Sequence, residues 1–343
     1  MPKHDDRLIG RWLLVCLLLI FAMVVLGGVT RLTGSGLSMV NWHPIHGVIP
    51  PVSLQEWQEE FSHYQKSPEY LKINRDMDLA SFKSIFWFEY SHRMLGRLIG
   101  LVFLVPFLVF WFRRQIRPGL TPRLIIMFML GGLQGLLGWY MVKSGLVNNP
   151  HVSQYRLTAH LMSAIVIYGF ILWTVLDLLD QKGYKSLATS EAKSWRIGSL
   201  MLTGLLLLTI ISGGFVAGLK AGMIYNTFPL MDGQWIPAGI GALSPWYLNL
   251  FENSVTVQFD HRVLTMISGL ALLGWYLGGR SVFNSTAISR SFKLVGMMVI
   301  IQVALGISTL LLQVPVWLGA AHQAGALLLF TVMLMNVHAL SRH

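Results

Sequence analysis

Long apolar runs separated by short polar stretches dominate the chain. A helix needs about 20 mostly apolar residues to cross the roughly 30 Å hydrocarbon layer of a membrane. Runs of this length recur along the whole chain, and each predicts one transmembrane helix. They cover 8–29, 90–112, 122–143, 156–178, 195–217, 260–279, 290–312 and 316–339. The pattern therefore predicts an all-α membrane protein with eight transmembrane helices.

The last four runs repeat the first four. The first and fifth runs both end in a glycine pair, 27–28 and 213–214, and His261 follows His92 by 169 residues. Further matches, in chain order, are Gln134 with Gln302, Gly138 with Gly306 and His160 with His322. Because each repeat has an even number of spans, both halves have the same orientation. We therefore expect two four-helix bundles related by a pseudo-twofold axis along the membrane normal.

The repeat also sets the expected domain organisation. Residues 1–180 form an N-terminal four-helix half with an outer segment at 30–88. Residues 181–194 are a cytoplasmic linker, and 195–343 form the C-terminal half with an outer segment at 218–259.

Two short polar helices are expected in the first outer segment. Ser53 and Glu56 have the spacing of a capping box, in which each side chain accepts a hydrogen bond from the other residue's backbone N–H. Ser67-Pro68 is typical of a second helix start. The aromatic residues in 86–90 (FWFEY) are typical of a membrane interface, where the second transmembrane helix enters the bilayer.

The composition and the distribution of charge agree with a membrane protein. Of 343 residues, 54% are hydrophobic and 12% are charged, about half the charged share of an ordinary soluble domain. The net charge of +11 comes largely from basic residues at the ends of the runs, such as Arg7, Arg113, Lys193 and Arg280. By the positive-inside rule these ends and both termini are cytoplasmic. Basic residues placed at helix ends, rather than along a stripe, argue against nucleic-acid binding.

The N-terminal sequence favours a retained membrane anchor. No small-residue cleavage site follows the first run, and no Arg/Ser-rich amphipathic segment precedes it. We therefore expect a protein of a bacterial inner membrane. The one cysteine, Cys16, lies inside the first run, so neither an intrachain disulfide nor a thiolate metal cluster can form.

Four histidines lie near the outer ends of the even-numbered runs: His92, His160, His261 and His322. Ionisable residues at membrane depth are costly and usually serve a purpose. Imidazole is a preferred axial ligand of heme iron, and two histidines on non-adjacent helices of a bundle can clamp one porphyrin. The alternative is that each histidine is an interhelical hydrogen bonder. Four histidines in repeat-related pairs favour iron ligands.

The two halves differ at the position three residues before the first histidine, which is Glu89 in one half and Gln258 in the other. Residues three apart share a helix face, so Glu89 lies beside His92. A carboxylate partly out of water can hold a proton near neutral pH, as a reacting site requires. The alternative is that Glu89 only pairs with Arg93 or another neighbouring residue. Arg93 and Arg262, each next to a histidine, are candidates to neutralise heme propionates.

These motifs resemble those of the heme A synthases. The resemblance rests on EYSHRMLGRLIG (89–100), on VQFDHR (257–262) preceded by FEN (251–253), and on the duplicated eight-helix layout. It covers nearly the whole chain. Some members carry cysteine pairs in their outer loops, whereas this chain is similar to the cysteine-free branch that includes the mitochondrial enzymes.

The resemblance implies an enzyme that oxidises the C8 methyl of heme O to a formyl group by successive hydroxylations. The product, heme A, serves terminal cytochrome oxidases. The resemblance places substrate heme O at His92 and His160, with Glu89 essential, and a heme b at His261 and His322.

Two other classes of protein fit parts of the pattern. One is a bis-histidine diheme cytochrome b that oxidises quinol, and the unmatched Glu89 argues against it. The other is a transporter built on a four-plus-four repeat, and the gathering of ionisable groups at the outer end argues against that. A heme A synthase implies heme O, an electron donor, the lipid bilayer, heme O synthase and oxidase assembly factors as partners. The sequence leaves open the donor's identity, the oxygen source, a homo-oligomer, the occupancy of the N-terminal site and the roles of His43 and His46.

Overall fold

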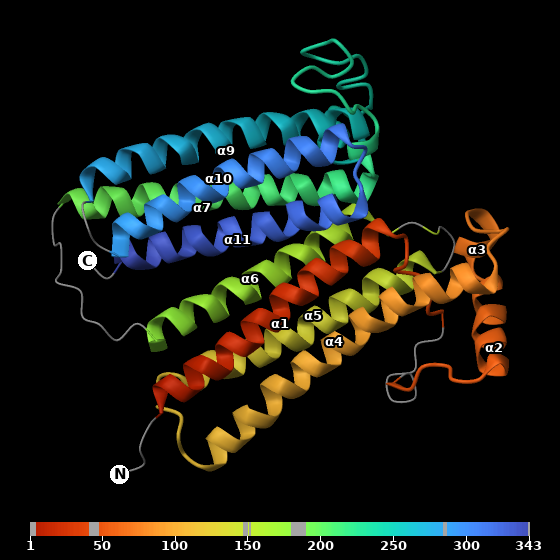
Figure 1. Cartoon of the computed structure of the whole chain (residues 1–343), viewed down its shortest axis with the longest axis horizontal. Helices are drawn as coiled ribbons and strands as arrows, with labels where there is room; N and C mark the ends of the chain where they lie inside the picture. The colour runs from red at the N-terminus through yellow and green to blue at the C-terminus, as the bar shows by residue number, and fades with distance from the viewer. Residues whose placement is uncertain are drawn as a thin grey trace. The chain divides into compact units, whose positions relative to one another are not determined.

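A computed structural model describes residues 5–40, 48–146, 150, 152–179, 190–283 and 287–341. Within these residues, eight helices are long and apolar enough to cross a membrane, and there is no β-strand. In chain order they are α1 (Asp6–Leu32), α4 (Leu79–Phe112), α5 (Thr121–Gly145), α6 (Gln154–Leu179), α7 (Ser190–Leu219), α9 (Ser254–Val282), α10 (Ala287–Leu311) and α11 (Val316–Ser341) (Figure 1). The predicted all-α membrane protein with eight spans is confirmed.

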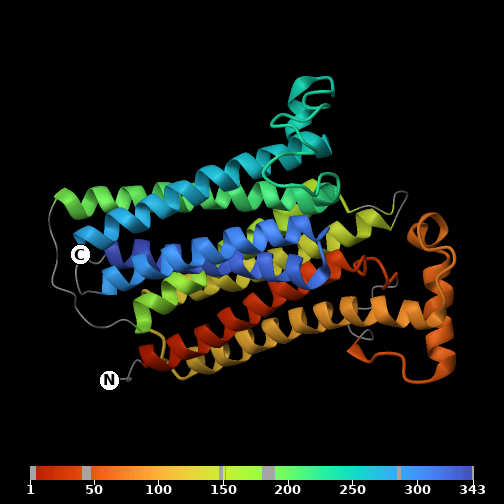
Figure 2. The ribbon, with the colours of Figure 1, turned by 45° about the horizontal axis from the view of Figure 1, so that its top comes forward.

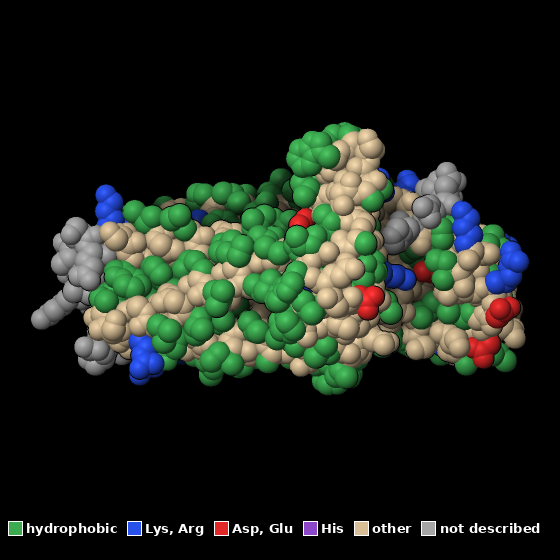
Figure 3. Space-filling view, turned by 90° about the horizontal axis from the view of Figure 1, so that it is seen from above, with side chains coloured by type: hydrophobic (Ala, Val, Ile, Leu, Met, Phe, Trp, Pro, Cys, Tyr) green, Lys and Arg blue, Asp and Glu red, His purple; other side chains and the backbone are tan. Residues whose placement is uncertain are grey.

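The chain divides into two compact units. The first unit contains Val15–Ile167, and the second contains Asp6–Leu14 together with Tyr168–His343. In the second unit, α7, α9, α10 and α11 lie side by side as a bundle in both ribbon views (Figures 1 and 2). Hydrophobic side chains are spread along the helical face seen in Figure 3, while the Lys and Arg side chains visible there lie mainly toward its two ends. This distribution is the one expected of helices that contact lipid.

The first unit contains the two short polar helices expected before the second span, α2 (Leu54–Gln65) and α3 (Pro68–Lys72). The capping box is present, because Glu56 N–H donates to Ser53 Oγ at 3.2 Å and Ser53 N–H donates to Glu56 Oε2 at 3.0 Å. Backbone N–H groups, that of Ser53 foremost, lower the pKa of the Glu56 carboxyl. Ser67 caps α3 through the backbone N–H of Tyr70.

The main difference from the predicted spans is the start of α4, which lies at Leu79 rather than at residue 90. Asp78 caps this end by accepting a hydrogen bond from the backbone N–H of Ser81 at 2.8 Å. The additional turns carry Phe82 and Phe86, which are buried against α2. Phe86, predicted as part of an interfacial belt, is therefore a core residue, because an aromatic face repeating every three to four residues packs on a neighbouring helix.

The segment between α7 and α9 contains two 3₁₀ turns, η2 (Ala221–Met223) and η3 (Trp246–Leu248), and the short helix α8 (Asn249–Glu252). Asparagine side chains order this segment. Asn249 bonds both backbone groups of Leu243, at 2.9 and 2.8 Å. Asn253 accepts the first N–H groups of α9 and donates to the carbonyl of Gly239 at 2.8 Å.

A buried asparagine joins all four helices of the second-unit bundle. Asn336 on α11 is fully buried, and its Oδ1 accepts from Ser199 Oγ at 2.7 Å and Trp275 Nε1 at 3.2 Å. Its Nδ2 donates to Ser291 Oγ at 2.9 Å. Each of these partners lies on a different helix, so one amide connects α7, α9, α10 and α11.

We predict that Asn336→Ala destabilises the protein. The substitution leaves buried donors of Ser199 and Trp275 without their acceptor, at a cost of about 1–3 kcal/mol. Unfolding by sodium dodecyl sulfate in mild detergent measures the change in free energy. Ser281→Ala, at an exposed end of α9, is the control and should leave stability unchanged. Equal stability of the two variants would contradict a joining role for Asn336.

Candidate functional site

In the first unit, two of the predicted histidines pack directly on glycines of neighbouring helices. A Cβ built on Gly27 of α1 would lie 3.1 Å from Cε1 of His92 on α4. A Cβ built on Gly138 of α5 would lie 2.9 Å from Cε1 of His160 on α6. Glycine at both positions thus lets an imidazole ring lie close against the helix backbone.

The second unit repeats both contacts. A Cβ on Gly213 of α7 would lie 3.1 Å from Cε1 of His261 on α9. A Cβ on Gly306 of α10 would lie 2.9 Å from Cε1 of His322 on α11. These residues match those of the first unit by sequence position, so the repeat found in the sequence extends to side-chain contacts.

The structure brings the histidines together in the expected pairs. His92 and His160 lie close enough to interact electrostatically within the first unit, and so do His261 and His322 within the second. All four side chains are partly buried. Each unit therefore presents two imidazoles from non-adjacent transmembrane helices.

The surroundings of the Nδ1 atoms differ between the units. Among the described residues, the buried Nδ1 atoms of His92 and His160 have no hydrogen-bond partner. In the second unit, Nδ1 of His261 lies 2.8 Å from Ser212 Oγ, and Nδ1 of His322 lies 3.1 Å from Gln302 Nε2. Two similar histidine pairs thus differ in the polar atoms behind the rings.

Matching glutamines lie behind the second histidine of each pair. Gln134 donates to the carbonyl of His160 at 2.9 Å, and Gln302 donates to that of His322 at 3.0 Å. Gln134 Oε1 also accepts from Ser163, whereas Oε1 of Gln302 has no partner among the described residues. These glutamines hold the histidine-bearing helices against α5 and α10.

The donor set fits heme better than a bare metal ion. Within the part of the chain that the structure describes, no three His, Cys, Asp or Glu side chains gather where they could hold a metal ion. Heme iron takes only axial ligands from the protein, because the porphyrin supplies the others. A pair of imidazoles with glycines behind both rings fits that requirement in each unit.

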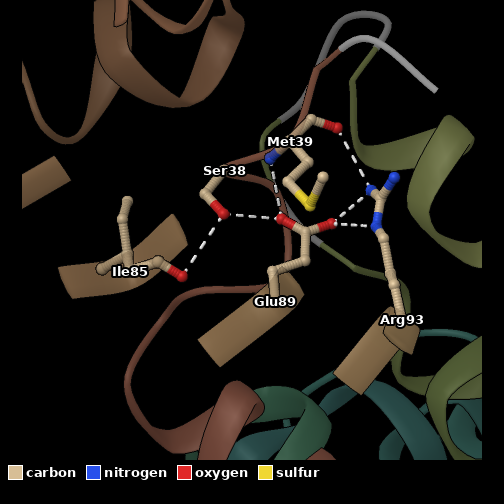
Figure 4. A network of polar contacts seen from close by, with 5 residues as sticks. All are labelled: Ser38, Met39, Ile85, Glu89 and Arg93. Atoms are coloured by element: carbon tan, nitrogen blue, oxygen red, sulfur yellow. Dashed lines mark hydrogen bonds and ion pairs between the residues drawn. The ribbon is translucent and has the colours of Figure 1, made fainter. Parts of the chain in front are cut away.

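Glu89 attaches the segment after α1 to helix α4 (Figure 4). Its buried carboxylate accepts from Ser38 Oγ at 2.7 Å and from the backbone N–H of Met39 at 2.8 Å. The other oxygen accepts from Arg93, which also donates to the Met39 carbonyl at 3.1 Å. The side chain of Ser38 lies 3.4 Å from the carbonyl of Ile85. We call this network the Glu89 clamp.

The second unit contains a counterpart of the Glu89 clamp in which the amide of Gln258 takes the place of the carboxylate. Gln258 Nε2 donates to the carbonyl of Tyr225 at 3.0 Å, and Arg262 donates to the same carbonyl at 2.8 Å. Arg262 also donates to the Thr227 carbonyl at 2.8 Å. Tyr225 follows the first glycine of its pair by as many residues as Met39 does in the first unit. The same loop position is therefore held in both units, by a carboxylate in one and by an amide in the other.

These contacts bear on the roles predicted from the sequence. The Glu89–Arg93 ion pair, given above as an alternative, is present. Arg93 and Arg262 donate to the loops, and their contact with heme propionates stays a prediction. His43 and His46 lie outside the described residues.

Several residues that form polar contacts in the structure were not predicted from the sequence. Ser38 and Ser212 carry no motif, and only their positions relative to the glycine pairs could have indicated them. His338, near the inner end of α11, is buried. Its Nε2 lies 3.1 Å from Asp177 Oδ1, and its ring packs edge-on against Trp173. No spacing rule connects residues so far apart in the chain.

The fold and the site define a polytopic helical membrane protein with two repeat-related histidine pairs. The profile of the COX15-CtaA family, described as cytochrome oxidase assembly protein, matches residues 10–334. The chain is 52% identical to the heme A synthase of Nitrosospira multiformis, over 100% of this chain and 98% of the relative. It is 47% identical to the heme A synthase COX15 of Bos taurus, over 99% of this chain and 84% of the relative. The chain therefore belongs to the COX15-CtaA family, and the resemblance found in the sequence is confirmed.

We predict that Gly138→Ala and Gly213→Ala each displace a histidine ring. The new Cβ would lie 2.9 Å from the ring of His160 or 3.1 Å from that of His261, so the ring must move. If the histidines ligate heme, the affected site should bind heme about 10–100-fold more weakly, as is typical when the support of a ligating histidine is lost, and the purified variants should contain less heme. Pyridine hemochrome spectra and chromatography of the extracted heme measure this loss.

Matched controls lie on the same two helices. A Cβ at Gly135 of α5 or Gly204 of α7 would meet nothing within 4 Å. Gly135→Ala and Gly204→Ala should therefore keep full heme content. Equal heme in test and control variants would show that the glycine contacts do not position the ligands.

Proposed function

We propose that this protein is a heme A synthase, a membrane-bound heme-dependent oxidoreductase that converts heme O to heme A. The proposal rests on one observation: of two repeat-related histidine pairs, the first has the buried carboxylate of Glu89 at the position where the second has the amide of Gln258. Membership of the family and the names of the full-length relatives support the same activity. The reaction oxidises the C8 methyl of heme O to a formyl group by successive hydroxylations.

We assign the substrate to the first unit and an auxiliary heme b to the second. His92 and His160 would hold heme O or heme A, and His261 and His322 would hold heme b. Heme supplies redox-active iron at either place. The protein's own residues orient the imidazoles, through the glycines behind the rings, and shape the outer loops next to them.

The Glu89 clamp supports the assignment of the reacting site to the first unit. Glu89 lies three residues before His92 on α4, and its carboxylate joins that helix to the backbone of Met39. The segment after α1 is thereby held beside the histidine pair. In the second unit the neutral Gln258 holds the matching loop, so a carboxylate is not needed for attachment alone. We infer that the negative charge beside His92 serves the reaction, in addition to holding the loop.

The diheme cytochrome b and the transporter weighed from the sequence find no support among the relatives, which carry the name heme A synthase. For the placement in the cell, we propose a bacterial inner membrane with both termini cytoplasmic and the histidine pairs toward the outer side. The basic residues at the helix ends support this orientation. Heme O synthase, oxidase assembly factors, an electron donor and a second copy of the chain are the partners to be tested by co-purification in mild detergent.

Replacing Glu89 tests the proposal. In cells that supply heme O, the wild-type protein should purify with heme A and heme b. Glu89→Gln and Glu89→Ala should lower heme A by at least about tenfold, as expected when a group that acts in the reaction is removed. Both should keep heme b and accumulate heme O, because the contacts described above for Glu89 are with residues of the first unit, whereas heme b is assigned to the second. Chromatography of the extracted hemes separates the three.

The control for this test is Glu59→Gln, which neutralises an exposed carboxylate on α2 and should leave heme A formation unchanged. If the wild type yields only heme b, the protein is an electron-transfer cytochrome and the proposed function is wrong. If Glu89→Gln forms heme A at the wild-type rate, the residue only attaches the loop, as Gln258 does.

A further inference from the structure

We propose that Ser212 fixes the ligating form of His261 and so makes the second unit a site of permanent heme binding. We further infer that Leu26, at the matching position, leaves His92 without such an anchor and keeps the first unit exchangeable. This inference rests on the proposed function, because it takes the second histidine pair to hold heme b and the first to hold the substrate. It concerns what distinguishes a retained heme from a heme that must leave.

The two rings are placed alike, so they can be compared directly. A Cβ on Gly27 would lie 3.1, 3.7 and 4.0 Å from Cε1, Nδ1 and Nε2 of His92. A Cβ on Gly213 would lie 3.1, 3.7 and 3.8 Å from the same atoms of His261. The residue before the glycine is Leu26 in the first unit and Ser212 in the second. The main difference at this contact is a hydroxyl group.

The hydrogen bonds of Ser212 determine which nitrogen of His261 carries the proton. Ser212 Oγ donates its hydrogen to the carbonyl of Thr209 at 2.7 Å. The same oxygen lies 2.8 Å from Nδ1 of His261 and can therefore only accept there. We therefore infer that Nδ1 carries the hydrogen, which leaves the lone pair on Nε2 for a metal. Such a second bond orients a ligating imidazole and raises its basicity.

No such arrangement exists around His92 in the described part of the first unit. Its Nδ1 is buried without a hydrogen-bond partner, and Leu26 has no group that could accept one. One turn earlier the same contrast recurs. In the second unit Thr209 bonds Ser268 of α9 at 2.7 Å, whereas the matching Met23 lies against Gly96 of α4 with apolar atoms. The α1–α4 contact is apolar where the α7–α9 contact is hydrogen-bonded.

This contrast suits the two tasks that the proposed function requires. A synthase must take up heme O and release heme A at one site while it keeps an auxiliary heme at the other. An imidazole whose Nδ1–H donates to an acceptor, as we infer for His261 and Ser212, binds iron more tightly than one whose Nδ1 is unpartnered, and loss of such an acceptor typically costs 10–100-fold in metal affinity. Ser212 is therefore a positioning residue for the auxiliary heme, and Leu26 marks the exchangeable site.

The first test compares Ser212→Ala with Ser212→Thr in the full-length protein purified in detergent. Transfer of heme b to an excess of apomyoglobin gives its rate of release. We expect Ser212→Ala to release heme b about 10–100-fold faster and to raise its midpoint potential, because a less basic ligand stabilises the oxidised iron less. Ser212→Thr, which keeps a hydroxyl, should restore both values. If Ser212 served helix packing alone, Ser212→Thr would not restore the midpoint potential of heme b.

The second test introduces the anchor into the first unit. Leu26→Ser should slow the release of heme O and heme A by about tenfold or more. Leu26→Ala removes the same bulk without adding a hydroxyl and is the control, with no such slowing expected. Chromatography separates these hemes from heme b in the transfer assay. Leu26→Ser leaves the second unit unaltered. It therefore tests whether a hydroxyl at this position slows heme release even if Ser212→Ala does not fold.

His261→Ala separates failure of the inference from failure of the proposed function. If this variant keeps its heme b, the assignment of heme b to the second unit is wrong. If heme b is lost there, yet Ser212→Ala releases heme at the wild-type rate, Ser212 does not anchor the ligand. Equal release from Leu26→Ser and Leu26→Ala would likewise overturn the inference.

Discussion

The contact between an imidazole ring and a glycine backbone is the interaction on which the rest of this structure depends. It occurs at four repeat-related places, and at each one a Cβ would lie 2.9 or 3.1 Å from the ring. Packing that close requires neighbouring helices to approach without an intervening side chain. The helix pairs α1–α4, α5–α6, α7–α9 and α10–α11 therefore have their separations set by the glycines that receive the histidines.

On this shared frame, a few polar atoms make the two units different. Glu89 and Gln258 hold matching loops, one through a carboxylate and the other through an amide. Leu26 and Ser212 precede matching glycines, and only Ser212 reaches a histidine nitrogen. The two units can thus share the histidine–glycine contacts while single differences, Glu89 against Gln258 and Leu26 against Ser212, give them different polar contacts.

Other polar side chains attach loops and helices that the hydrophobic effect alone would not hold together. Between helices that face lipid, apolar contacts carry no preference for one neighbour over another, whereas a hydrogen bond does. Arg93 and Arg262 bind the outer loops through backbone carbonyls. Asn336 joins four helices of the second unit through one amide. Each of these groups makes several bonds, as expected where an unsatisfied polar atom is costly.

The sequence by itself determined the eight spans, the repeat, the four histidines, the Ser53–Glu56 capping box and the Glu89–Gln258 difference. These follow from run length and short-range spacing, which are local properties of the chain. Only the tertiary structure decided that glycines support the histidines, that Glu89 accepts from Ser38 and Met39, and that Phe86 is buried against α2. The tertiary structure was also needed to show that Ser212 Oγ lies within hydrogen-bonding distance of Nδ1 of His261. Such contacts depend on how two helices approach and rotate, and no spacing within either helix encodes that approach.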